Sequence, residues 1–142
     1  MAEKSLWGYL RDNMKGRWAH ARRHEDSIGL GVPDVSYYHR GNSWIELKEV
    51  KQLPARDTTG ISLGQWHENG GAQRHFLVMR KGWLLVRVNK PVRTYLLYHW
   101  EYLPPWEKKK RWTWDQFQSH AHYIWTNRID FDILQDFLGD PE

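Results

Sequence analysis

The stretch GVPDVSYYHRGNSWIELKEVK, residues 31–51, decides the fold of this chain. It contains two runs of β-forming residues, Val32–His39 and Ser43–Val50, joined by a short connection around Gly41. Two such runs separated by a few residues that include glycine predict a β-hairpin. We therefore expect the rest of the chain to be built around this hairpin.

Charged side chains occupy one face of the predicted hairpin, where a half-buried strand usually carries apolar residues. Glu46 and Lys48 alternate with apolar residues, so they share one face of the second strand. A hairpin symmetric about Gly41 places Asp34 directly opposite Lys48, with the Cβ atoms of Asp34 and Glu46 roughly 7–8 Å apart on that face. A register shifted by one residue would move Asp34 to the other face.

Two carboxylates and an ammonium group at this spacing suit the hydrolysis of a phosphodiester. Carboxylate oxygens are hard ligands that hold Mg²⁺ or Mn²⁺ and leave water positions open. The metal acidifies a water molecule and neutralises charge on phosphate, and an ammonium group stabilises the same charge or orients the attacking water. The alternative for Glu46 and Lys48 is a pair of charges on a solvated face. Asp34 directly follows Pro33. The combination of Pro-Asp, a turn and Glu-x-Lys is less often a coincidence than the Glu-x-Lys triplet alone.

Three short motifs follow one another in a characteristic order: Gly31-Val32-Pro33-Asp34, Glu46-Leu47-Lys48 and Ser62-Leu63-Gly64-Gln65. In this order and spacing they resemble the PD-(D/E)xK nuclease superfamily, and most closely its VRR-NUC branch, which is frequent in phages. The resemblance covers about residues 3–90. It implies a restriction-endonuclease-like core, which is an α/β fold with a central mixed sheet flanked by helices.

The resemblance also implies a Mg²⁺-dependent deoxyribonuclease, with Mn²⁺ able to substitute. Asp34 and Glu46, assisted by the Leu47 carbonyl, would bind the metal. Lys48 would stabilise the developing charge or orient the attacking water. The matching glutamine of the family, Gln65 here, faces the active site and helps to position water or substrate.

Ser62 and Gln65 have a second interpretation. The pattern Ser-x-x-Gln is a capping box, in which Gln65 bonds back to the start of a short helix over about residues 62–69. The cap explains the spacing without any function, and both interpretations stay open at this point.

A helix is predicted from Glu3 to about Lys15, because apolar residues recur there at a spacing of four. In the resembled family, the helix before the hairpin often supplies one more acid to the metal site. Glu3 matches that acid by position, and Glu25 is the alternative. A carboxylate at Glu3 also complements the helix dipole, which is a sufficient structural reason for it.

Composition limits the classes of protein to which the chain can belong. Its 142 residues suit one ordinary domain, and its net charge of +4 is compatible with a nucleic-acid partner. The absence of cysteine excludes disulfides, zinc–thiolate sites and thiol catalysis. No apolar run long enough for a membrane span and no signal-like start are found, so we expect a soluble, cytoplasmic protein that does not bind membranes.

Cations near aromatic residues predict contact with DNA. The chain has ten tryptophans, and bases stack on exposed indole rings. Lysine and arginine bind phosphates without reading sequence. The alternative is that these charges belong to an edge strand, a connecting loop and a solvated basic run. The candidates for DNA contact are Arg22, Arg23, Lys51, Arg56, Lys109, Arg111 and Trp112.

The remaining elements are predicted from periodicity. We expect strands within residues 17–26 and over 75–79 and 83–88, and a strand or a docking segment over 94–100. A helix is expected over 114–127, and a short amphipathic helix over 131–138. Residues 1–90 would form the nuclease core. Residues 91–142 would form a Trp-rich helical C-terminal extension packed on the core, where it binds DNA or pairs two subunits of a homodimer.

The function that these observations favour is a metal-dependent DNA endonuclease. We expect it to select the structure of junction, flap or branched DNA, as repair and recombination require, because no sequence-reading module is evident. The first alternative is a catalytically inactive nuclease-fold protein that binds DNA. The second is an unrelated interaction protein in which the motif match is accidental.

Overall fold

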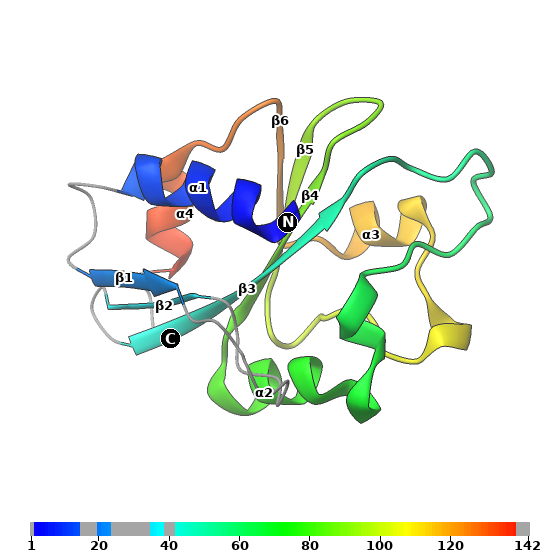
Figure 1. Ribbon diagram of the computed structural model, residues 1–142, viewed down its shortest axis with the longest axis horizontal. Coiled ribbons are helices and arrows are strands. Elements are labelled where there is room, and N and C mark those ends of the chain that lie inside the picture. The colour runs from blue at the N-terminus through cyan, green and yellow to red at the C-terminus, as the bar shows by residue number, and fades with distance from the viewer. Residues whose placement is uncertain (1, 15–19, 24–34, 39–41, 139–142) are drawn as a thin grey trace.

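The computed structural model of this chain describes residues 2–14, 20–23, 35–38 and 42–138. These residues form an α/β fold with a mixed sheet in the order β1-β2-β3-β4-β5-β6, flanked by helices (Figure 1). The predicted α/β class is therefore confirmed. The elements are α1 (Ala2–Met14), β1 (His20–Arg23), β2 (Val35–Tyr38), β3 (Asn42–Val50), the 3-10 turns η1 (Gly64–His67) and η2 (Asn69–Gly71), α2 (Ala72–Arg80), β4 (Trp83–Val88), β5 (Thr94–Tyr98), the 3-10 turn η3 (Lys108–Lys110), α3 (Trp114–His120), β6 (Tyr123–Thr126) and α4 (Phe131–Leu138).

Strands β2 and β3 form the predicted antiparallel hairpin, but in a different register. Val35 lies opposite Ile45, whereas symmetry about Gly41 would have placed it opposite Leu47. The predicted register is therefore wrong by two residues. Because side chains alternate with a period of two, an even shift keeps every side chain on its face. Glu46 and Lys48 therefore still share one face of β3, as the sequence predicted.

Strands β3 and β4 are parallel, and every other pair of neighbouring strands described is antiparallel. A parallel pair needs a crossover connection, which here runs through η1, η2 and α2. All residues of β4 and β5 are buried. The strand predicted over residues 83–88 is therefore confirmed as β4, and its complete burial is typical of a strand that is covered on both faces.

The sheet separates two apolar cores. Odd-numbered residues of β3 and β4, such as Leu47 and Leu85, pack with α1 and α4. Even-numbered residues of β4, such as Leu84, pack with Trp66 and with residues of α2 and α3. Each of these leucines is fully buried, and burying one contributes about 1.5–3 kcal/mol to stability. Figure 1 shows α1 and α4 on one side of β3, and α2 and α3 on the other.

Two secondary-structure predictions were wrong. Residues 75–79 lie in α2, which follows the left-handed residue Gly71 and ends at the left-handed residue Lys81. Within α2, Leu77 is fully buried while Met79 is 81% exposed, so the apolar run spans opposite sides of a helix. The predicted helix over 114–127 ends at His120, because the following residues form β6 and pair with β5.

The chain after residue 91, predicted to be a helical extension packed on the core, instead completes the sheet and contributes to both cores. It supplies β5 and β6 to the sheet. Strand β5 lies within residues 94–100, where a strand or a docking segment was predicted, and the predicted helix over 131–138 is present. Phe131, Leu134 and Leu138 of α4 belong to the core that α1 covers. In the described part of the chain, no helix combines the length and apolar character that a membrane span requires.

Candidate active site

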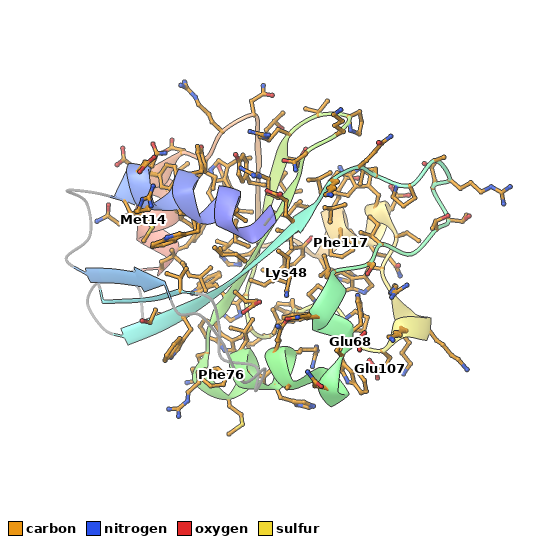
Figure 2. The ribbon with its side chains drawn as sticks, in the orientation of Figure 1. Met14, Lys48, Glu68, Phe76, Glu107 and Phe117 are labelled. Carbon is orange, nitrogen blue, oxygen red and sulfur yellow. The ribbon has the colours of Figure 1, made fainter. Side chains whose placement is uncertain are left out.

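Glu46 and Lys48 lie side by side on the α2 side of β3. The Lys48 Nζ atom is 3.2 Å from the Glu46 Oε2 atom. Lys48 is 6% exposed and Glu46 is 2% exposed. Strand β3 positions them, since Ile45 and Leu47 are held in the core on the opposite face. Figure 2 shows Lys48 near the centre of the molecule, between β3 and the segment that carries η1.

The pair lies on β3 just beyond Ile45, the residue that faces the first described residue of β2, Val35. The described pairing of β2 with β3 reaches Val35 and Ile45, while the pairing of β3 with β4 continues along the rest of β3. Asp34, the predicted second carboxylate, is the residue bonded to Val35, and it lies outside the described residues, as does Glu25. The residue next to Asp34 in the chain, Val35, therefore faces Ile45, the residue next to Glu46.

Two other predicted ligands can be placed only in part. Glu3 belongs to α1, which packs through Leu6 and Leu10 on the face of β3 opposite Glu46; its side chain is outside the described atoms. The Leu47 side chain has no donor atom and is fully buried in that same core, so the predicted ligand at this residue is its carbonyl.

The capping-box interpretation of Ser62 and Gln65 is wrong. The N-cap of η1 is Leu63, and no side chain caps it. Ser62 Oγ instead accepts a hydrogen bond of 3.1 Å from the backbone N–H of Gly64, which is a turn within the loop. Gln65 is exposed, so its spacing from Ser62 is not explained by a cap.

His67 is a buried residue near the site that the sequence did not single out. Its Nε2 atom accepts a hydrogen bond of 3.0 Å from the Leu63 N–H, so its Nδ1 must carry the proton that is donated to the Trp106 carbonyl at 2.7 Å. Burial lowers the pKa of His67, and the positive charges of Arg111 and Lys48 add to this effect, whereas the Trp106 carbonyl and the negative charge of Glu68 oppose it. The ring is therefore a neutral link between two loops.

Those two loops, residues 60–71 after β3 and residues 103–113 after β5, are joined along their length. Besides the His67 bond, the Ile61 N–H donates to the Trp112 carbonyl at 2.8 Å. Lys108 of the second loop also forms an ion pair of 3.2 Å with Glu68 of the first; Figure 2 labels Glu68. The basic run of the C-terminal region is thus held against the loop that follows the candidate catalytic strand.

The tryptophans of this region pack against neighbouring residues, although Trp106 and Trp112 keep part of their surface in solvent. Trp66 is fully buried. The ring of Trp106 lies against Gly71, where an added Cβ would approach it to 2.5 Å. Trp112 stacks on His120 with ring centroids 4.8 Å apart. Packing of the fold therefore accounts for these three tryptophans without any stacked base.

The predicted DNA-contacting cations lie in different surroundings. Lys51, Arg56 and Lys109 are exposed, Arg111 is partly buried, and the side chains of Arg22 and Arg23 in β1 are outside the described atoms. Lys51 and Arg56 lie in the loop directly after β3, and Lys109 lies in η3. The exposed members can reach a phosphate backbone without rearrangement of the fold.

The donor chemistry at the site fits a divalent hard cation. Glu46 supplies a buried carboxylate, the ligand type that Mg²⁺ and Mn²⁺ prefer. Because Lys48 offsets its charge, one further carboxylate is needed to attract a dication, and Asp34 is the candidate that the sequence offers. Neither the models of known protein families nor the curated proteins contain a match to this chain.

Proposed function

We propose that this protein is a metal-dependent DNA endonuclease with a restriction-endonuclease-like core of the PD-(D/E)xK kind. The observation that carries the proposal is the position of Glu46 and Lys48. They lie 3.2 Å apart on one face of β3, at the end of a hairpin whose first described residue, Val35, directly follows Asp34. This is the combination of groups that phosphodiester hydrolysis uses.

In this proposal Glu46 and Asp34 hold Mg²⁺ or Mn²⁺, and the Leu47 carbonyl assists. When bound, such a cation acidifies water and neutralises charge on phosphate. Lys48 is held in place by Glu46 and donates from Nζ to a phosphate oxygen or to the attacking water. Gln65, exposed in η1, is available to position water or substrate.

DNA is the proposed substrate, with junctions, flaps or other branched structures preferred. Exposed Lys51 and Arg56 directly follow β3, and exposed Lys109 lies on the loop held against the site. Cations of this kind bind the phosphate backbone irrespective of sequence. Symmetric cutting of a four-way junction would in addition require a homodimer with two sites.

The test is cleavage of labelled single-stranded, duplex, flap and four-way-junction DNA in Mg²⁺, Mn²⁺ or EDTA. Wild type is compared with Asp34→Ala, Glu46→Gln and Lys48→Gln, and each variant should lose at least about 10²–10³-fold in rate. Glu49→Gln is the matched control, because it breaks the ion pair with Arg87 on the other face of β3. Cleavage that persists in all three site variants would overturn the proposal.

The near-complete burial of Glu46 and Lys48 favours one second candidate, a nuclease-fold protein that binds DNA without cutting it. A pair this buried can be purely structural. Equal binding in Mg²⁺ and EDTA, with no cleavage of any substrate, would select this candidate. Absence of any DNA binding would contradict both.

A further inference from the structure

Arg111 is a partly buried arginine for which the described residues provide no hydrogen-bond or ion-pair partner. Its Nε atom is shielded from solvent and has no hydrogen-bond acceptor, and the guanidinium forms no ion pair in the described part of the chain. A buried donor without an acceptor costs about 1–3 kcal/mol, and a charged donor costs more. Buried polar groups in folded proteins are almost always satisfied, so an exception of this kind points to a ligand.

The backbone at Arg111 is held firmly against the loop after β3. A Cβ atom added at Gly60 would lie 2.8 Å from the Arg111 Cβ and 3.1 Å from its carbonyl oxygen, so only glycine permits this approach. The next residue, Trp112, accepts the hydrogen bond from Ile61. Arg111 is therefore placed by close packing and is not on a freely moving tail.

The other cations of the basic run differ from Arg111. Lys108 pairs with Glu68 at 3.2 Å, and Lys110 pairs with Glu107 at 3.7 Å. Both lysines are well exposed, so these pairs are weak and solvated. Arg111 combines partial burial with an unmatched charge, and this combination sets it apart from its neighbours.

The unmatched charge lies on the same side as the candidate catalytic pair. Trp112, the residue after Arg111, packs on the core on this side of the sheet. The charges of Arg111 and Lys48 also both lower the pKa of His67, after the larger effect of burial. Glu68 also acts on His67, in the opposite direction, and it pairs with Lys108. Glu46 offsets the charge of Lys48, whereas no acid among the described residues forms an ion pair with Arg111. The region around His67 therefore carries excess positive charge and suits an anion.

We infer that Arg111 binds a phosphate group of the nucleic-acid strand beside the Glu46–Lys48 pair and so positions that strand for cleavage. The inference rests on the proposed function and assigns a subsite to it. A guanidinium offers a planar fork of donors that matches two phosphate oxygens, and a phosphate would also give the orphaned Nε–H an acceptor. Arg111 acts as a positioning residue, while the exposed Lys109 contributes only general attraction.

The direct test is the ¹⁵N NMR signal of the Arg111 Nε–H group, which is assigned by its loss in Arg111→Lys. A short single-stranded oligodeoxynucleotide is added in Ca²⁺, and a second sample receives inorganic phosphate alone. We expect the oligonucleotide to shift this signal and the His67 ring signals, and phosphate to produce the same shift at higher concentration. An unchanged Nε–H signal at saturating oligonucleotide would overturn the inference.

The kinetic test compares Arg111→Gln and Arg111→Lys with Lys110→Gln, an exposed neighbour. Loss of a charge-assisted contact should lower kcat/KM by at least about tenfold in Arg111→Gln, with partial rescue in Arg111→Lys and little change in Lys110→Gln. Circular dichroism and thermal unfolding confirm that each variant is folded. If Arg111→Gln cuts DNA as well as Lys110→Gln, the subsite is wrong although the nuclease stands.

The two proposals fail separately. If wild type cuts no substrate with any metal while DNA still shifts the Arg111 Nε–H signal, the nuclease proposal fails and Arg111 is the anion contact of a DNA-binding protein. In that case Arg111→Gln should weaken DNA binding more than Lys110→Gln does. Equal binding by the two variants would overturn the assignment to Arg111.

Discussion

Glu46 and Glu49 lie on the same strand, β3, and each forms a buried ion pair on a different face of the sheet. Glu46 pairs with Lys48 on the side of α2, and Glu49 pairs with Arg87 of β4 on the side of α1. Both pairs are almost fully shielded from solvent. Only the first lies on the side where the loops 60–71 and 103–113 gather, so the second serves as an internal control for the first.

Replacing Lys48 by methionine should lower the free energy of unfolding by about 3–5 kcal/mol, because the buried Glu46 carboxylate then loses the ammonium group that pairs with it. Mg²⁺ should restore part of this loss, since a bound dication takes the place of the ammonium group and ligand binding stabilises the folded state. Thermal unfolding in Mg²⁺ and in EDTA measures both effects. The control is Glu49→Gln, which should be destabilised without an added response to Mg²⁺. An equal Mg²⁺ response in Glu46→Gln/Lys48→Met would argue against a metal site at Glu46.

Gly71→Ala should be more destabilising than Gly70→Ala. Both glycines have positive φ, +78° and +64°, so both alanines carry a left-handed penalty of about 1–2 kcal/mol. At Gly71 the new Cβ would also come within 2.5 Å of the Trp106 ring, whereas at Gly70 it meets nothing within 4 Å. The difference in unfolding free energy, from urea titration, isolates the contact between the two loops. Equal losses would show that the Trp106 contact adds nothing.

Stability should fall as the pH is lowered through 6.5, and His67 should contribute to this fall. Burial lowers the pKa of His67 in the folded state below the ordinary value of 6.5. Below that pH the unfolded chain takes up a proton that the folded chain does not, so protonation favours unfolding. Burial also lowers the pKa of His99 and His122, which act in the same direction.

Urea unfolding over a series of pH values measures the effect at His67. His67→Gln should show a weaker pH dependence than wild type, although it is less stable at neutral pH because it loses the bond to Trp106. His75, which is exposed on α2, provides the control variant His75→Gln. If His67→Gln keeps the full pH dependence of wild type, the effect belongs to other groups.

Tyr98 should make the fold sensitive to alkali. Its hydroxyl is buried and donates to the Phe117 carbonyl, and burial raises its pKa well above the ordinary value of 10. Above pH 10 the unfolded chain loses a proton that the folded chain keeps, so stability should decline as the pH rises. Tyr98→Phe should cost about 0.5–1.5 kcal/mol at neutral pH and decline less in alkali. Parallel alkaline declines in the two proteins would contradict this assignment.

Local sequence patterns were sufficient for the central elements. Alternation in residues 43–50 placed Glu46 and Lys48 on one face, because the side-chain period of a strand is two whatever its partner. Continuous hydrophobicity over residues 83–88 indicated the buried strand β4, and the spacing of apolar residues over 131–138 indicated α4. Each of these depends on neighbours within a few positions of the chain.

Contacts between distant segments decided the rest. Residues 123–126 had helical spacing but became a strand, because β5 offered them a partner. The neutral tautomer of His67 depends on its bond to the distant Trp106 carbonyl. The hairpin register and the surroundings of Arg111 likewise depend on how segments of the chain pack together. The sequence by itself determined which groups could do chemistry, whereas tertiary packing decided which of them meet, because burial and charge at a site depend on all the segments packed around it.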